Sequence, residues 1–301
     1  MAEVVTVTLN AALDITYEVE ALVPNATHRV AAVHHRAGGK GVNVARVLAT
    51  LGVEVVATGL AGGGAGAEIT ADLATAGVPA RFAPVAGNSR RTVTVVADGD
   101  ATIFNEPGPA VTPAEWRDFR VLFLELCRDA RVVVLSGSLP PGVAPGAYAE
   151  LVTGARALGA RVLLDADGEA LGLGVAAGPD IVKPNAAELE RAAGRGPARE
   201  VASRLLAAGA GAVVVSRGAD GLLAVTPHGD WSARPARRLP GNPTGAGDAA
   251  AAALARALLA PEPIDWPAVL ADAVALSAAA VLSPVAGTVD LAAYRALSQE
   301  M

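Results

Sequence analysis

One carboxylate in this chain directly follows a glycine-rich loop and opens an alanine-rich segment. The loop runs from Asn242 to Gly247 and is followed by Asp248 and the run Ala249–Ala253. Because glycine permits tight turns and alanine favours helix, this pattern predicts a glycine loop that leads into a helix. The N-terminus of a helix attracts anions, so this loop is suited to bind a phosphoryl group. Asp248 lies directly beside the loop, where a carboxylate can act as a base for transfer of that group to a hydroxyl. The alternative is that Asp248 only caps the helix.

A second set of candidate groups is the sequence Lys183-Pro184-Asn185, with Glu188 three residues further on. Pro184 and the helix predicted to start here would hold the Asn185 amide and the Glu188 carboxylate on one turn. Such oxygen atoms are suitable ligands for Mg²⁺, directly or through its water molecules. The alternative is a helix capping box, which uses the same spacing.

Three further charged residues are candidates for binding a substrate. Arg29 and Arg90 lie in segments where apolar residues alternate, and two arginines can hold a phosphate group between them. Each could instead be an exposed arginine on a strand. Asp14 follows the strand predicted at Val4–Leu9, and ligands bind at the carboxyl ends of strands in α/β sheets. We expect Asp14 to bind substrate hydroxyls, with an exposed turn as the alternative.

Two more glycine-rich loops precede predicted helices. In the first, within Ala37–Leu48, Lys40 is followed by glycine rather than by Ser or Thr, so the loop is not a Walker A phosphate loop. Asn43 lies in the first turn of its helix and could be the cap. The second loop, Gly62–Ala67, has a weak dinucleotide-binding spacing, but the acidic residue expected in the next strand is absent from Ala80–Val85. We interpret this second loop as a turn with close backbone approach.

Composition narrows the class of protein. A chain of 301 residues with 52% hydrophobic residues can bury a sizeable core. The net charge of −6 and the aromatic content of 3% disfavour nucleic-acid binding. The best membrane candidate, Ala268–Leu282, is interrupted by Asp272 and is too short, and no N-terminal signal pattern is present, so we expect a cytoplasmic protein. Cys127 is predicted to be a buried thiol, and the histidines lack zinc-binding spacing.

The order of predicted elements indicates an α/β fold. Helices of about a dozen residues alternate with short apolar strands, which is typical of a mainly parallel sheet with helices on both faces. Two pairs of short strands, approximately within residues 14–36 and 88–107, predict a small β-sheet lid over this unit. The first pair is expected at Thr16–Val19 and Arg29–Val33, and the second is joined by a turn at Ala97–Asp100. We expect residues 1–301 to form a single domain.

Taken together, these motifs resemble the ribokinase/PfkB family of sugar kinases. The two family signatures correspond here to Gly38-Gly39-Lys40-Gly41-x-Asn43-x-Ala45 and to Asn242-x-x-Gly245-Ala246-Gly247-Asp248. The motifs that resemble the phosphosugar branch of the family are Thr6–Asp14, Ser136–Gly142, Leu164-Asp165-x-x-Gly168 and Lys183-Pro184-Asn185-x-x-Glu188. The resemblance runs from about residue 4 to the end of the chain.

The resemblance implies a ribokinase-like domain that uses ATP and Mg²⁺ to transfer the γ-phosphoryl group to a hydroxyl of a hexose phosphate. Fructose 1-phosphate is the expected acceptor and fructose 1,6-bisphosphate the expected product, with tagatose 6-phosphate and fructose 6-phosphate as alternative acceptors. A non-catalytic sugar or nucleotide sensor on the same fold is a rival hypothesis, and a nicotinamide-dependent oxidoreductase using Gly62–Ala67 is another. An exposed apolar face on the lid would favour a homodimer formed through the lid.

The same resemblance implies a role for each candidate residue. Asp248 is expected to be the general base, while the N–H groups of Gly245, Ala246 and Gly247 stabilise charge on the transferring phosphoryl group. The residues expected to bind the sugar phosphate are Asp14, Arg29, Gly38, Gly39, Lys40, Asn43, Arg90 and Ser138. The residues expected to bind the nucleotide are Lys183, Asn185, Ser216, Gly218, Gly221, Gly245 and Gly247, and those expected to organise Mg²⁺ are Asn185 and Glu188.

Two stretches depart from the family pattern. The sequence Ala166-Asp167 stands where the branch commonly has Thr-Ser, and the all-alanine run Ala249–Ala253 replaces a more varied segment. Neither change removes a candidate catalytic group. The extra negative charge of Asp167 leaves the choice of substrate open.

Overall fold

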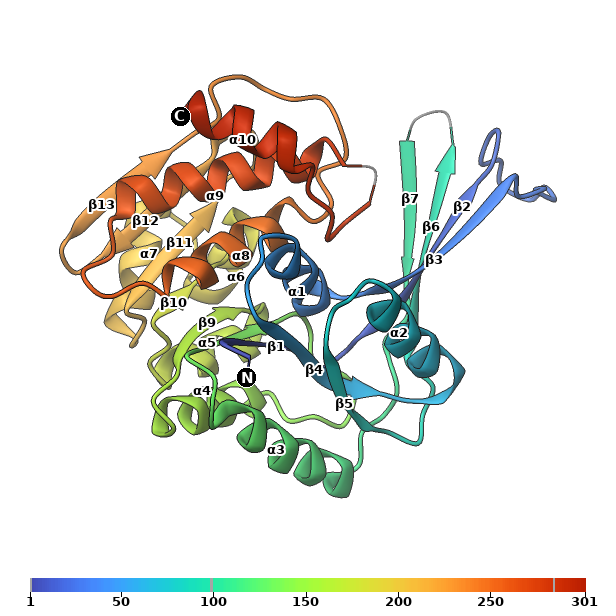
Figure 1. Ribbon diagram of the computed structural model, residues 1–301, viewed down its shortest axis with the longest axis horizontal. Coiled ribbons are helices and arrows are strands. Elements are labelled where there is room, and N and C mark those ends of the chain that lie inside the picture. The colour runs from blue at the N-terminus through green and yellow to red at the C-terminus, as the bar shows by residue number, and fades with distance from the viewer. Residues whose placement is uncertain (1, 98–99, 284) are drawn as a thin grey trace.

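The computed structural model describes residues 2–97, 100–283 and 285–301. Within these residues the chain forms a nine-stranded sheet and a separate four-stranded sheet, which Figure 1 shows together with the helices. The strand order of the large sheet is β13-β12-β11-β10-β9-β8-β1-β4-β5. Its strands are β1 (Val4–Thr8), β4 (Val55–Ala61), β5 (Ala80–Pro84), β8 (Val132–Ser136), β9 (Arg161–Asp165), β10 (Ile181–Val182), β11 (Ala212–Ser216), β12 (Leu222–Thr226) and β13 (Gly229–Ala233).

The large sheet is parallel from β5 to β11, and β12 and β13 continue it as an antiparallel edge. Every residue of β1 is buried, and Val4 pairs with Val55 on one side and with Val132 on the other. Strands covered on both faces have such continuous apolar sequences, because neither row of side chains meets water. The α/β fold with a mainly parallel sheet is therefore as predicted.

Helices cover both faces of this sheet. One face carries α1 (Lys40–Thr50), α2 (Gly63–Thr75), α8 (Ala246–Ala257), α9 (Trp266–Val281) and α10 (Leu291–Gln299), and the other carries α3 (Pro113–Cys127), α4 (Ala147–Ala157), α5 (Gly168–Ala176), α6 (Ala186–Ala193) and α7 (Ala198–Ala207). Side chains of one strand alternate between the two cores, as Val4 and Val5 do.

The alanine-rich helix α8 is almost entirely enclosed. All residues from Asp248 to Ala255 are buried, and α8 packs between α1 and α9 (Figure 1). Small side chains let helix backbones approach one another closely, so the alanine run has a packing role. This close approach brings the start of α8 next to α1.

The small sheet consists of β2 (Ala12–Glu18), β3 (Ala32–Gly38), β6 (Arg90–Ala97) and β7 (Asp100–Asn105), in the order β3-β2-β6-β7. It projects away from the large sheet (Figure 1). Asp14 pairs with Thr92, and Thr92 with Asn105, so these three polar residues share one face. Ile15, Val93 and Phe104 share the opposite face by the same register.

The small sheet was predicted, but its strand boundaries differ. β2 begins at Ala12 and β3 at Ala32, so Arg29 lies in the connection between them rather than in a strand. β6 and β7 form the expected antiparallel pair, while residues 98 and 99 of the expected turn lie outside the described residues. None of the helices within residues 2–97, 100–283 and 285–301 is long and apolar enough to span a membrane.

Candidate active site

The glycine loop and α8 form the first wall of the site. Gly245 is the N-cap of α8 and has φ 88°, and a Cβ atom at this position would lie 2.9 Å from the Cα of Ala286. Both the left-handed backbone and the close approach therefore require glycine here. Asp248 is the third residue of the helix and makes no capping hydrogen bond, so the interpretation as a cap is wrong.

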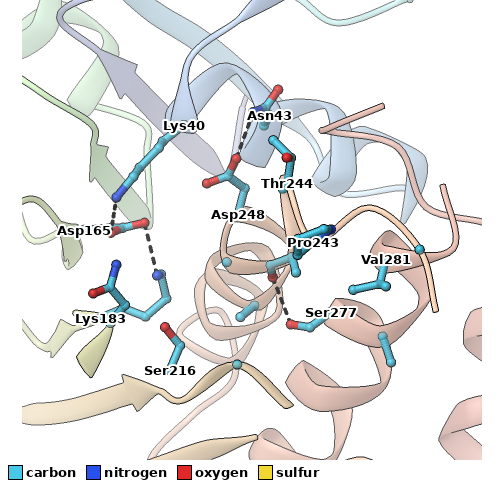
Figure 2. Close-up of a pocket in the computed structure, with 18 of the residues that line it drawn as sticks. Lys40, Asn43, Asp165, Lys183, Ser216, Pro243, Thr244, Asp248, Ser277 and Val281 are labelled. Carbon is cyan, nitrogen blue, oxygen red and sulfur yellow. Dashed lines mark hydrogen bonds and ion pairs between the residues drawn. The ribbon is translucent and has the colours of Figure 1, made fainter. Parts of the chain in front are cut away.

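The Asp248 carboxylate instead contacts α1. Asn43 Nδ2 donates a hydrogen bond of 2.8 Å to Asp248 Oδ2, and both residues are buried (Figure 2). Asn43 is not a cap either, because α1 begins at Lys40 after its N-cap Gly39. Burial, with a smaller contribution from the charge of Asp165, raises the pKa of Asp248 to about 6, although the Asn43 hydrogen bond and the two nearby lysines oppose these effects.

A buried carboxylate at the end of β9 connects three segments of the site. Lys40 Nζ lies 3.1 Å from Asp165 Oδ1, and Lys183 Nζ lies 3.3 Å from Asp165 Oδ2 (Figure 2). Ser136 at the end of β8 donates to the same carboxylate at 3.3 Å. Burial alone would raise the pKa of Asp165, but Lys183 and Lys40 outweigh burial and hold this pKa below its usual value. The motif containing Asp165 was noticed in the sequence, but no role was assigned to this residue.

Lys40 links this network to the start of α6. Its ammonium group lies 3.3 Å from Glu188 Oε1 as well as close to Asp165. Burial lowers the pKa of Lys40, but Asp165 and Glu188 outweigh burial, so the pKa is raised and Lys40 stays charged. Lys40 is thus directed towards the predicted nucleotide residues, although it belongs to the glycine loop that was predicted to bind the sugar.

Asn185 and Glu188 form the capping box that was the alternative to a metal site. Asn185 Oδ1 accepts from the Glu188 N–H and Glu188 Oε2 accepts from the Asn185 N–H, each at 2.8 Å. Glu188 is nevertheless buried at the cavity wall, and Lys40 forms ion pairs with both Glu188 and Asp165. Among the described residues, no group of three His, Cys, Asp or Glu side chains is arranged to hold a metal ion.

The other end of the site is formed by the small sheet. Arg90 Nε donates to the Asn10 carbonyl at 3.0 Å, and Arg90 also donates to the Thr92 hydroxyl at 3.1 Å. Burial raises the pKa of Asp14 to about 6, although the Thr92 hydroxyl and Arg90 oppose this effect. Gly38 lies against Asp14, because a Cβ atom at Gly38 would be 2.0 Å from Asp14 Oδ2.

These parts enclose one cavity of about 810 Å³. The predicted site residues that line it are Asp14, Gly39, Lys40, Asn43, Arg90, Lys183, Asn185, Glu188, Ser216, Gly218, Gly221, Gly245, Ala246, Gly247 and Asp248. The structure therefore brings together residues as far apart in the sequence as Asp14 and Asp248. The residues come from loops at the carboxyl ends of parallel strands and from one face of the small sheet.

Three predicted residues do not line the cavity. Arg29 is exposed in the connection between β2 and β3, so a single copy of the chain does not bring it to the cavity beside Arg90. Ser138 is also exposed, and its hydroxyl accepts a hydrogen bond from Asn10 Nδ2 at 3.2 Å. Gly38 is buried behind Asp14, and because it has no Cβ atom it leaves room for the Asp14 carboxylate.

The cavity also has walls that the sequence did not indicate. Thr92 and Asn105 extend its polar end on the small sheet, where strand register could have identified them once Asp14 was chosen. Leu222, Val274 and Val281 form part of an apolar end beside the glycine loop. Such an apolar region next to an anion-binding loop suits a planar base attached to a phosphate chain.

Three other sequence features lie outside the site. Asp167 caps α5 and pairs with Arg191 at 2.8 Å, and it does not line the cavity. Gly62 is the N-cap of α2, and a Cβ atom there would lie 2.1 Å from the Val85 carbonyl oxygen, so the close backbone approach predicted for this loop is confirmed. Cys127 is buried, and burial raises the pKa of its thiol to about 12, as expected for a structural residue.

Comparison with known proteins identifies the family of this chain. The pfkB family carbohydrate kinase model matches residues 7–291. The chain belongs to the pfkB family of carbohydrate kinases. The 1-phosphofructokinase of Rhodobacter capsulatus is 40% identical over 289 residues, covering 93% of this chain and 92% of the relative. The 1-phosphofructokinase of Escherichia coli (strain K12) is 36% identical over 278 residues, covering 90% of this chain and 89% of the relative.

Solved structures agree with this assignment. A crystal structure of Phosphofructokinase-2 from Escherichia coli in complex with potassium has a TM-score of 0.93 and 30% sequence identity, with 100% of this kinase and 99% of that chain covered. The ribokinase-like fold and the carbohydrate kinase activity expected from the sequence are therefore confirmed.

The Asp165 network gives a prediction about the stability of this kinase. Asp165→Asn removes the charge that compensates the buried Lys183, so we expect the free energy of unfolding to fall by about 3–5 kcal/mol. Denaturant unfolding at neutral pH measures this change. Asp167→Asn is the matched control, because its pair with Arg191 is about half exposed and contributes about 0–1 kcal/mol. Equal small losses in both variants would contradict the compensating role of Asp165.

Proposed function

We propose that this kinase transfers the γ-phosphoryl group of ATP to fructose 1-phosphate and forms fructose 1,6-bisphosphate. The observation that carries the proposal is the hydrogen bond between Asn43 and Asp248, which places a carboxylate with a raised pKa between the glycine loop and the polar face of the small sheet. The choice of substrate is supported by the two relatives named above, both of which are 1-phosphofructokinases.

The proposed chemistry is a direct transfer between two oxygen atoms. The acceptor hydroxyl of the sugar lies near Asp14 and Asn43 and gives its proton to Asp248 as its oxygen bonds to the γ-phosphorus. The bond from this phosphorus to the β-phosphate oxygen breaks, and ADP leaves. The first N–H groups of α8 have no intrahelical acceptors, so they stabilise the charge on the transferring group. Ala246 N–H donates to the Pro243 carbonyl at 3.2 Å, which leaves the N–H groups of Gly245 and Gly247 as the better candidates.

The two ends of the cavity suit the two substrates. Arg90 is the cation at the small-sheet end, and it is oriented by Asn10 and Thr92 for contact with the phosphate of the sugar. The nucleotide fits the opposite end, where Ser216, Gly218 and Gly221 lie beside the apolar wall and Lys183 points to Asp165. In this arrangement the phosphate chain of ATP extends towards Asp248.

Mg²⁺ is the expected companion of ATP, and the oxygen atoms near α6 fit it in hydrated form. Both Glu188 oxygens already accept hydrogen bonds, from Lys40 and from the Asn185 N–H, so they suit contact with water ligands of the ion. When bound, Mg²⁺ neutralises charge on the phosphate chain. Lys40 and Lys183 hold their positive charges at the same end of the cavity through Asp165.

The proposal is tested by ADP release with a panel of acceptors. We expect turnover with fructose 1-phosphate to exceed turnover with tagatose 6-phosphate and fructose 6-phosphate. Activity confined to unphosphorylated sugars would refute a phosphosugar kinase. Tight binding of sugar or nucleotide without ADP formation would instead identify a non-catalytic sensor.

Variants in the same assay test the role of Asp248. Asp248→Asn should lower kcat by about 10²–10⁴-fold, the usual contribution of a positioned general base. Asp118→Asn, on the exposed part of α3 with a side chain 69% exposed, is the control and should retain full activity. A kcat of a tenth or more of the original in Asp248→Asn is incompatible with this role.

The pH dependence of kcat/KM provides a further prediction. The base must be ionised, so kcat/KM should fall as the pH decreases through about 6, the pKa to which burial raises Asp248. Because phosphate monoesters also titrate near about 6, the wild-type profile is compared with that of Asn43→Ala. This substitution removes a hydrogen bond that lowers the pKa of Asp248, so the acidic limb should move to higher pH while the titration of the substrate does not change. An unmoved limb would exclude Asp248 as its source.

We also propose that two copies associate through the small sheets. Part of the face opposite the cavity is apolar and uncovered, with Phe104 57% exposed and Val33 51% exposed. A second copy would remove this surface from water.

Light scattering tests this association. The wild-type protein should have the mass of a dimer at micromolar concentration. Phe104→Lys should give the mass of a monomer, because dimer formation would bury the lysine charge in the interface without a partner. Val121→Lys, at a 65% exposed valine on α3, is the matched control and should not change the mass. A wild-type monomer would refute the proposal.

A further inference from the structure

Two arginines at the rim of the cavity have no part in the chemistry described so far. Arg237 and Arg238 lie in the connection between β13 and α8, and both line the cavity. Both are exposed, so water can hydrate them when the cavity holds no ligand.

The path of this connection places the two arginines at the nucleotide end. Its start packs on the loop after β11, since a Cβ atom at Gly221 would lie 2.0 Å from the Ala233 carbonyl. Its end packs on α9, where the Asn242 N–H donates to the Val281 carbonyl at 2.9 Å. The segment between these two fixed points therefore runs along the cavity from Gly221 to the glycine loop.

The charges of the other cations at the cavity are already compensated or lie elsewhere. Lys40 and Lys183 pair with buried carboxylates, and Arg90 is held at the small-sheet end. Within the described part of the chain, the Arg238 side chain makes no hydrogen bond or ion pair. Arg237 has an ion pair with Glu300 at 3.6 Å, but its side chain is 67% exposed, and such pairs contribute little to stability. Both guanidinium groups are thus available to an anion.

We propose that Arg237 and Arg238 bind the phosphate chain of the nucleotide and so select phosphorylated nucleotides over the nucleoside. A guanidinium group offers several N–H donors in one plane and matches the oxygen atoms of a phosphate. The Glu300 carboxylate competes with the phosphate chain only weakly, because water screens the exposed pair. This inference rests on the proposed use of ATP at this end of the cavity.

Calorimetric titration with MgADP and with adenosine tests the inference without requiring turnover. Arg237→Gln and Arg238→Gln should each weaken MgADP binding by about tenfold, as expected for the loss of one charge-assisted hydrogen bond, and should leave adenosine binding unchanged. In turnover assays, KM for MgATP should rise while kcat and KM for the sugar phosphate are retained. Arg234→Gln is the matched control, since Arg234 is an exposed arginine of the same segment that does not line the cavity.

Unchanged MgADP affinity in the Arg237→Gln, Arg238→Gln double variant would overturn the inference, as would an equal loss of MgADP and adenosine affinity. The binding measurements are independent of catalysis. A protein that binds MgADP but does not phosphorylate fructose 1-phosphate would refute the proposed function alone. Normal turnover together with unchanged nucleotide affinity in the variants would refute the inference alone.

Discussion

The buried carboxylate of Asp165 needs positive charge around it, and this requirement connects most of the site. Asp165 is only 1% exposed, and an isolated charge in such a position would be very costly. Lys40 comes from the start of α1 and Lys183 follows β10, so compensation of one charge brings two separate segments to the end of β9. The same charge raises the pKa of Asp248. A single buried group therefore influences both the position of the cations and the proton affinity of Asp248, the proposed base.

Packing provides the second constraint. The alanines of α8 allow this helix to lie close to α1, and the close approach is what lets Asp248 reach Asn43. Larger side chains in the run Ala249–Ala253 would separate the two helices. The composition that first looked like a departure from the family pattern is thus coupled to the geometry of the site.

The parts predicted best from the sequence were those with local signals. The fold could be identified from the glycine loops before helices and from the apolar strands. Most of the cavity wall could be identified from the residues that follow these strands, because the carboxyl ends of parallel strands converge. Arg29 was misplaced because alternation alone does not fix where β3 begins, and its true start at Ala32 leaves Arg29 in a connection. Asp165 was not assigned a role because its partners, Lys40 and Lys183, are distant in sequence. The arginines at 237 and 238 lie in a segment without regular structure and gave no local signal.

The residues proposed for the reaction are divided between the small sheet and the large sheet. Asp14 and Arg90 belong to strands of the small sheet, whereas Asp248 lies in the first turn of α8, which packs on the large sheet. In the proposed reaction the sugar phosphate contacts both parts, whereas a water molecule has no phosphate group to offer Arg90. If the proposed roles hold, this division provides a physical means of discriminating against water as the acceptor. Futile hydrolysis of ATP is disfavoured wherever productive geometry depends on a ligand that spans the two sheets.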